Sequence, residues 1–227
     1  MSKKAILRDR ILRGARRARL ELADGLVDRL CVYVELLSRW NQKMNLTALD
    51  EREVGLERLL IEPLAAARHL PAADGRLVDI GSGGGSPAIP MTLAAPNWSL
   101  LMVESKIRKS AFLREACRHL ELSNATVHTG RYESLFARPE LHEAHDVLSV
   151  RAVRVDAGLL RGLQAFVKPE GQLFLFRSSG VPEVPKDLQP PLAWRATYAI
   201  GSASHSRLVV LEKLVFGRFG REAPTEG

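Results

Sequence analysis

The stretch LVDIGSGGGSPAIP, residues 77–90, holds the residues whose types and spacing point most clearly to chemistry. Four glycines within five positions follow a short apolar run and precede two prolines. Glycine tolerates a positive φ and lets a ligand lie directly on the main chain. If LVDI is a buried strand, the glycines form the turn at its carboxyl end, where open α/β sheets bind their ligands. The stretch therefore predicts a loop that holds a ligand on its backbone, with a purely structural turn as the alternative.

Two kinds of ligand use such a turn. The dinucleotide fingerprint G-x-G-x-x-G, read from Gly81, requires a third glycine where Ser86 stands. The pattern D-x-G-x-G-x-G, read from Asp79, fits without exception through Gly81, Gly83 and Gly85. This second pattern resembles motif I of the Rossmann-like S-adenosylmethionine methyltransferases, so we expect Asp79 and the three glycines to form a cofactor loop.

Glu104 is the second candidate cofactor residue, because it ends the next apolar run, twenty-one residues after Gly83. A carboxylate at this place accepts hydrogen bonds from both ribose hydroxyls of an adenosine. S-adenosylmethionine and NAD share that ribose, whereas a 2′-phosphate would be repelled. The alternative is a surface acid that pairs with Lys106 or Arg108.

The elements that must position these residues alternate along the chain from residue 76. Apolar runs predict strands at 77–80, 100–104, 125–129, 146–150, 172–176, 194–200 and 207–216, and the stretches between predict helices at 87–95, 106–121 and 154–167. Such alternation implies right-handed βαβ units and a parallel sheet. The last two strands lack a long helix between them, which predicts an antiparallel pair at a sheet edge. We expect an α/β fold with a mostly parallel, Rossmann-like methyltransferase sheet.

The residues before this sheet predict a helical extension. Apolar residues from Leu22 to Trp40 recur at three- and four-residue steps, as on the core-facing side of a helix. A second helix is predicted over 51–69, where Pro63 should start or bend a segment. We therefore divide the chain into a basic N-terminal arm (1–20), a helical extension (21–75), a methyltransferase domain (76–216) and a disordered tail (217–227).

The net charge of +7 is concentrated at the start of the chain, because residues 1–20 hold eight basic residues and one acid. Such an arm attracts polyanions through phosphate contacts, and a solvated helix face or an organelle transit peptide are the alternatives. Residues 80–103 carry no charge, but their glycines and prolines exclude a membrane-spanning helix. Cys31 and Cys117 are expected to be small core residues, which fits a reducing cytoplasm and a cytoplasmic protein without a membrane anchor.

Longer segments resemble one family, the bacterial small-subunit ribosomal RNA methyltransferase G family (glucose-inhibited division protein B). YVELLSRWNQKMNLT (33–47) looks like its W-N-x-x-x-N-L-T segment, and GSGGGSPAIP like its G-x-G-x-G-x-P-G-I-P. Residues 104–135 are similar to the region around its third strand, SVRAV (149–153) to its S-R-A segment, and SRLVVLEK (206–213) to its final strand. The resemblance runs from about residue 26 to 214.

This resemblance implies S-adenosylmethionine-dependent methylation at N7 of a guanine in the decoding region of 16S rRNA. The substrate would be that RNA or the small ribosomal subunit, and the protein a monomer. Residues carried over to the cofactor site are Gly81, Ser86, Tyr132, Glu133 and Arg151, with the pair at 132–133 flanking the adenine. Residues carried over to the substrate are Arg131, Arg151 and Arg177, the last standing where the family has lysine.

The sequence also departs from the family. Ser86 stands where a bulky apolar residue is usual and Ala88 where glycine is usual. The family segment R-H-x-x-D-S reads RLLIEP in this chain, at residues 58–63, with a leucine in place of the histidine and a proline at its end. These differences affect the packing or the RNA contacts expected of the second helix.

The implied chemistry fits the residues, because guanine N7 has a free lone pair and no proton. No general base is needed, and we expect no catalytic residue beyond positioning groups. Arg151 could hold guanine O6 or a phosphate, unless it only bridges to Asp79 or Glu104. His142 and His145 lack further ligands, so no metal site is expected. Two other functions stay open: a NAD-dependent oxidoreductase and a non-catalytic RNA-binding protein of ribosome assembly.

Overall fold

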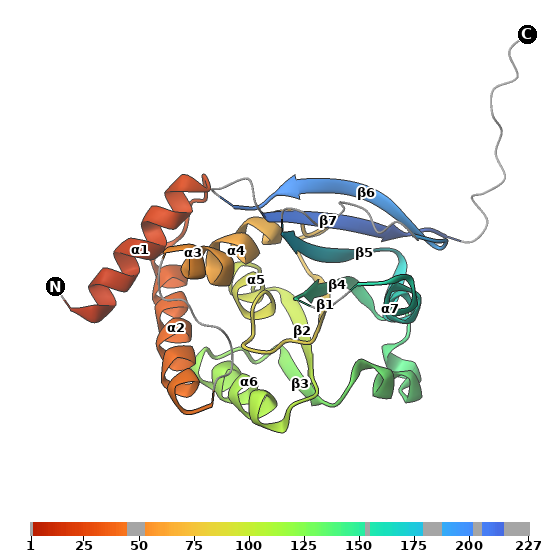
Figure 1. Ribbon diagram of the computed structural model, residues 1–227, viewed down its shortest axis with the longest axis horizontal. Helices are drawn as coiled ribbons and strands as arrows, with labels where there is room; N and C mark the ends of the chain where they lie inside the picture. The colour runs from red at the N-terminus through yellow and green to blue at the C-terminus, as the bar shows by residue number, and fades with distance from the viewer. Residues whose placement is uncertain (1, 45–52, 153–154, 179–187, 202–205, 216–227) are drawn as a thin grey trace, which may run out of the picture.

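A computed structural model describes residues 2–44, 53–152, 155–178, 188–201 and 206–215 (Figure 1). The chain begins with a helical part, which comprises α1 (Lys3–Arg17), α2 (Asp24–Met44), α3 (Glu53–Leu56), the π-helical turn η1 (Glu57–Ile61) and α4 (Glu62–Ala67). The predicted disordered tail, 217–227, lies outside the described residues. Both helices predicted before the sheet are thus present.

The sheet has seven strands in the order β3-β2-β1-β4-β5-β7-β6. These are β1 (Gly75–Ile80), β2 (Trp98–Glu104), β3 (Ala125–Thr129), β4 (His145–Arg151), β5 (Val167–Ser178), β6 (Leu192–Ala199) and β7 (Ser206–Lys213). The first five strands pair in parallel, while β7 pairs antiparallel with β5 and β6. The predicted sheet and its antiparallel edge pair are confirmed. Strand order reverses between β1 and β4, which is the place where open α/β sheets bind ligands.

Both faces of the sheet are covered, and successive side chains of a strand point to opposite faces. In β1, Leu77 belongs to one core cluster and Val78 to the other. The face of Leu77, which we call the extension face, is covered by the N-terminal helices with α5 (Ala88–Ala94) and α6 (Ile107–His119). The opposite face is covered by η2 (Tyr132–Ala137), η3 (Pro139–Leu141), α7 (Ala157–Leu163) and η4 (Gln164–Phe166). Asp79 lies two residues after Leu77 on β1, and Arg151 lies two residues after Ser149, the register partner of Asp79 on β4. The side chains of Asp79 and Arg151 therefore point toward the extension face.

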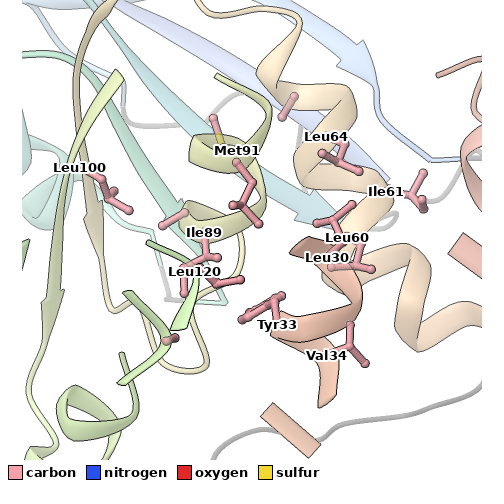
Figure 2. Packing of buried hydrophobic residues seen from close by; sticks show 14 of the residues in the cluster. Leu30, Tyr33, Val34, Leu60, Ile61, Leu64, Ile89, Met91, Leu100 and Leu120 are labelled. Carbon is pink, nitrogen blue, oxygen red and sulfur yellow. The ribbon is translucent and has the colours of Figure 1, made fainter. Parts of the chain in front are cut away.

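A shared apolar core joins the N-terminal helices to the sheet (Figure 2). Leu30 of α2, Leu60 of η1 and Ile89 of α5 are all fully buried in it, and each such side chain contributes about 2 kcal/mol. Cys31 lies in the same core and Cys117 is half-buried beside it. Burial raises the pKa of both thiols, so both behave as core residues, as predicted. None of the helices formed by the described residues is long and apolar enough to span a bilayer.

The basic N-terminal residues form helix α1, which packs on the rest of the protein. Ile11 of α1 is buried, because the helix lays an apolar stripe against α2 and η1. Arg8 forms an ion pair with Asp28 of α2 at 2.9 Å, and Arg17 pairs with Glu53 of α3 at 2.9 Å. Part of the positive charge of this segment is therefore neutralised within the chain.

Pro63 shapes the last helix of the extension. A proline lacks the N–H that would bond the carbonyl of Leu59 in an α-helix, or of Arg58 in a π-helical turn. The π-helical turn η1 directly precedes α4, and the Glu62 N–H donates to the Glu57 carbonyl. The expectation that Pro63 starts a segment is confirmed, since it lies in the first turn of α4. The carbonyls of Arg58 and Leu59 are left for other donors.

Candidate cofactor and substrate site

The glycine-rich loop between β1 and α5 has the backbone that its sequence predicts. Gly81, Gly83 and Gly85 have positive φ angles of 76°, 53° and 88°. A Cβ at Gly85 would lie 2.5 Å from Ile89 Cδ1, so this glycine allows the loop to pack closely on α5. A Cβ at Gly83 would meet, among the described residues, only the Gly81 carbonyl at 3.7 Å. The main chain at Gly83 therefore borders space that a ligand can occupy.

Glu104 lies across from this loop at the end of β2, the neighbour of β1 in the sheet. Its Oε2 accepts the Gly83 N–H at 2.9 Å, and its Oε1 accepts the Lys106 N–H at 2.7 Å. The alternative of a surface acid paired with a basic side chain is wrong, because Glu104 is only 6% exposed and binds backbone N–H groups. Oε1 also accepts the Ser105 hydroxyl at 3.5 Å, whereas Oε2 has a further lone pair, so the side chain can still accept from a ribose.

Asp79 is a buried acid two residues before the loop. Ser149, its register partner on β4, donates its hydroxyl to Oδ1 at 2.6 Å. Oδ2 is buried and has no hydrogen-bond partner within the described part of the chain. Burial raises the pKa of Asp79 to about 6, while the Ser149 hydrogen bond and the charge of Arg151 act in the opposite direction. A buried acceptor without a partner is rare, and this one suits a cationic or N–H-bearing ligand group.

Tyr33 belongs to the site and was not among the predicted residues. Its fully buried side chain donates from Oη to the Gly84 carbonyl at 2.6 Å. Burial raises the pKa of this phenol, so it stays a donor. The sequence could have indicated this role. Tyr33 follows Leu30 by three residues on the apolar side of α2, and a buried tyrosine needs a hydrogen-bond partner for its hydroxyl. Helix α2 thereby fixes the position of the glycine-rich loop.

Tyr132 and Glu133 begin η2, which follows β3, and the Tyr132 ring lies against Gly162 of α7 on the face opposite the extension face. The Gly130 N–H donates to the Glu104 carbonyl at 3.0 Å, which ties this turn to the end of β2. Tyr132 is half-buried, whereas Glu133 and Arg131 are exposed. The structure thus brings the two predicted adenine-side residues to the same sheet edge as Glu104.

The three arginines predicted to contact substrate are not brought together. Arg131 follows β3, whereas Arg151 ends β4 and Arg177 lies near the end of β5. Strands β2 and β1 separate β3 from β4 in the sheet. Arg151 and Arg177 line one pocket, whereas Arg131 lies in the turn between β3 and η2.

Arg151 is held in a buried polar network. Its guanidinium pairs with Glu62 and donates to the Arg58 carbonyl. The side chains of Arg151 and Glu62 are 12% and 5% exposed. Burial lowers the pKa of Arg151, and the Glu62 charge opposes that shift. The alternative of a bridge to Asp79 or Glu104 is wrong, because Glu62 is the acid in ionic contact with Arg151.

Ser86 completes the link between the loop and the helical extension. Its hydroxyl donates to the Leu59 carbonyl at 2.8 Å and lies 3.5 Å from Nη1 of Arg151. The two carbonyls before Pro63 thus accept from side chains: the Leu59 carbonyl from Ser86, and the Arg58 carbonyl from Arg151. The departures at positions 63 and 86 are therefore complementary in this structure.

A pocket of about 330 Å³ opens beside Arg151. The Arg151 Cζ lies 5.3 Å from the ring centroid of Phe176, and Ser206 donates to Glu62 Oε1 at 2.7 Å. Nε of Arg177 is buried without a hydrogen-bond partner among the described residues, and burial lowers the pKa of this guanidinium. The pocket combines an aromatic face with cationic donors, which suits a nucleobase and its phosphate.

The described residues contain no group of three His, Cys, Asp or Glu side chains placed to hold a metal ion. His145 is buried at the start of β4, with Nδ1 3.0 Å from the Phe166 carbonyl. Burial lowers its pKa to about 4. Its neutral ring therefore has a structural partner, and His142 is exposed in the preceding turn.

Comparison with known proteins identifies a family. The sequence model described as GidB, rRNA small subunit methyltransferase G, matches residues 27–184. The ribosomal RNA small subunit methyltransferase G of Xanthomonas axonopodis pv. citri (strain 306) is 39% identical over 145 residues, which cover 64% of this chain and 66% of that protein. The protein of the same name from Stenotrophomonas maltophilia (strain K279a) is 35% identical over 178 residues, covering 78% and 80%. The match to the Xanthomonas relative thus spans just under two thirds of its length.

The fold also matches solved structures. A SAM-dependent methyltransferase from Aquifex aeolicus is similar with a TM-score of 0.55 and 13% identity, over 78% of this chain and 98% of that one. At this identity the likeness concerns the fold alone. It confirms the Rossmann-like methyltransferase sheet expected from the sequence.

Proposed function

This chain belongs to the rRNA small subunit methyltransferase G family, and on that premise we propose that it methylates N7 of a guanine in the decoding region of 16S rRNA, using S-adenosylmethionine. The observation that carries the proposal is the glycine-rich loop with its positive φ angles, whose Gly83 N–H donates to the buried carboxylate of Glu104 at 2.9 Å. We propose further that it acts as a monomer in the cytoplasm on 16S rRNA or the small ribosomal subunit.

The residues at the crevice fit this cofactor. The open space at Gly83 admits a ligand against the main chain, and Glu104 retains acceptor capacity for the ribose hydroxyls. Tyr132 and Glu133 would flank the adenine. The unpaired Oδ2 of Asp79 favours a cationic ligand, and S-adenosylmethionine carries positive charge at its sulfonium and ammonium.

Gly81, Gly85 and Ser86 would border the methionine part, next to β4. When bound, S-adenosylmethionine supplies the methyl group, and the acceptor atom N7 of guanine carries no proton to be removed. The work left to the protein is therefore to hold N7 in line with that methyl group and to exclude water. Arg151 and Arg177 would hold the base and its phosphate from the adjacent pocket, while Arg131 would contact RNA beyond the adenine.

Methyl transfer is tested with a radiolabelled donor and two substrates, naked 16S rRNA and small subunits, both from cells that lack this gene. We expect one 7-methylguanine in the decoding region, located by mass analysis of nuclease fragments. No transfer to either substrate would overturn the proposal and leave the non-catalytic RNA-binding alternative. Calorimetric titration with S-adenosylmethionine and NAD gives the second readout, and binding of NAD alone would support an oxidoreductase instead.

Two variants test the site itself. Arg177→Ala should raise KM for RNA without changing the dissociation constant of S-adenosylmethionine, because Arg177 lines the substrate pocket only. Arg195→Ala is the matched control, since Arg195 lies on the edge strand β6 and pairs with Glu212. An equal effect of the two substitutions would show that the pocket is not the substrate site.

A further inference from the structure

In the proposed reaction, the positive charge of Arg151 is unfavourable for methyl transfer. The inference for this residue rests on that proposed function. In methylation at N7, the lone pair of N7 forms the new N–C bond, while the S–C bond breaks and its electron pair stays on sulfur. No proton moves at N7, so positive charge leaves the sulfonium and appears on the guanine ring. A guanidinium beside that ring opposes the change, since like charges repel. Catalysis requires the surroundings to favour the charge that develops.

Glu62 is placed to remove this conflict. Its carboxylate pairs with the Arg151 guanidinium, and both side chains are almost completely buried. Ser206 donates to the other oxygen of the same carboxylate at 2.7 Å. We propose that Glu62 is a positioning residue that holds Arg151 and neutralises its charge, so that Arg151 can orient the guanine without opposing methyl transfer.

The fold brings these groups and the pocket residue Phe176 together from four segments of the chain. Arg151 on β4 and Phe176 on β5 are register partners, so they point to the same face of the sheet. Ser206 begins β7 at the same end of the sheet, opposite Ser178. Glu62 reaches them from the extension face, where the π-helical turn η1 precedes it; such turns are frequent at functional sites.

A purely structural ion pair is the competing explanation. A buried pair is weak evidence for stability, because its desolvation offsets much of its attraction. This pair also lines a pocket, and that pocket contains Arg177, whose buried Nε has no hydrogen-bond partner among the residues that the structure describes. Arg58 and Glu57 line the same pocket. Of the arginines that line the pocket, Arg151 is thus paired with the internal acid Glu62, while Arg177 has a donor that is free to bind a ligand. That arrangement suits a site in which Arg177 attracts the phosphate and Arg151 only orients the base.

Glu62→Gln removes the charge and keeps the shape, whereas Glu62→Asp keeps the charge. We expect the Gln variant to lower kcat on the order of tenfold, as one uncompensated charge about 5 Å from the guanine ring and about 9 Å from the sulfonium would do at an effective dielectric constant of about 20. KM for RNA should stay the same or fall, because the site becomes more cationic. The Asp variant should regain most of kcat. Glu212→Gln, which breaks the 2.6 Å pair with Arg195 on the edge strand, is the matched control and should change neither constant.

A second readout needs no turnover. RNA binding in the presence of S-adenosylhomocysteine is measured as a function of salt. In the Gln variant Arg151 is released to neutralise one more phosphate, so the slope of log K against log salt should steepen by about 0.7. Glu212→Gln should leave that slope unchanged.

Equal loss of kcat in the Gln and Asp variants, or a rise in KM alone, would overturn the proposal, and so would an unchanged salt slope. Thermal melting shows whether each variant folds. If Glu62→Gln does not fold, Ser206→Ala takes its place: it keeps the charge, so kcat should stay within about twofold, and a tenfold loss would refute charge compensation. Absence of methyl transfer by the unsubstituted protein would instead refute the proposed function, and the salt slope would still test Glu62.

Discussion

Replacing Asp79 by Asn should change how the stability of this protein depends on pH. The carboxyl group is buried, Ser149 donates to one oxygen, and the other oxygen has no partner in the described part of the chain. Burial raises its pKa from the usual 3.8 to about 6. A group whose pKa is higher in the folded state stabilises the fold when it is protonated. That contribution is complete below pH 3.8 and is lost as the pH rises through 6.

The magnitude follows from the two pKa values. A rise from 3.8 to about 6 corresponds to about 3 kcal/mol of unfolding free energy. Roughly 2 kcal/mol of this is lost above pH 4.5, since the unfolded carboxyl is already mostly ionised there. Asn does not titrate, so the variant lacks this loss. The N–H groups of the Asn side chain lower the unfolding free energy by an amount that does not vary with pH. The informative quantity is therefore how the difference in unfolding free energy between the two proteins changes with pH.

Urea unfolding of both proteins at intervals from pH 4.5 to pH 8 measures that difference. The unfolding free energy of Asp79→Asn minus that of the unsubstituted protein should increase by about 2 kcal/mol across this range. Asp74→Asn, at an exposed position before β1, is the matched control. A difference that stays constant would show that the pKa of Asp79 is not raised, and a difference that decreases would show that it is lowered. Either result would refute the reasoning from burial.

Three further substitutions test the crevice. Tyr33→Phe removes the hydroxyl that donates to the Gly84 carbonyl at 2.6 Å, so the calorimetric dissociation constant for S-adenosylmethionine should rise about fivefold. Gly85→Ala puts a Cβ 2.5 Å from Ile89 Cδ1 at a φ of 88°, and urea unfolding should show a loss of more than about 1 kcal/mol. Glu104→Gln should weaken S-adenosylmethionine binding about tenfold or more, with RNA binding by filter retention unchanged. Unaltered cofactor binding in the first and third variants would contradict the roles of Tyr33 and Glu104, and unaltered stability in the second would contradict that of Gly85.

The sequence was sufficient to predict the features that depend on local pattern. Apolar runs of strand length alternate with helical stretches, and each predicted strand is present in the sheet. The glycine-rich loop and Glu104 could be predicted because their spacing follows from two neighbouring parallel strands. Pro63 likewise predicts a helix start, because its missing N–H acts within one turn.

Contacts between distant segments could not be predicted in this way. Glu62 and Ser206 are 144 positions apart, and their meeting depends on the register of β7 and on the docking of α4. The alternative weighed for Arg151 was an ion pair with an acid at the strand ends, whereas its partner Glu62 comes from the helical extension. Arg131 and Arg177 are both basic residues near strand ends, but only the strand order shows that other strands separate β3 from β5.

The proline that interrupts the extension has a consequence for chimaeras between this chain and its relatives. An amino acid with an N–H at position 63 would supply a helix donor for one of the two carbonyls that now accept from Ser86 and Arg151. Transplanting residues 58–63 alone would therefore leave the Ser86 hydroxyl or the Arg151 guanidinium competing with the repaired helix. Chimaeras in which residues 58–63 and position 86 are exchanged together should fold, because the groups that contact one another then come from the same parent.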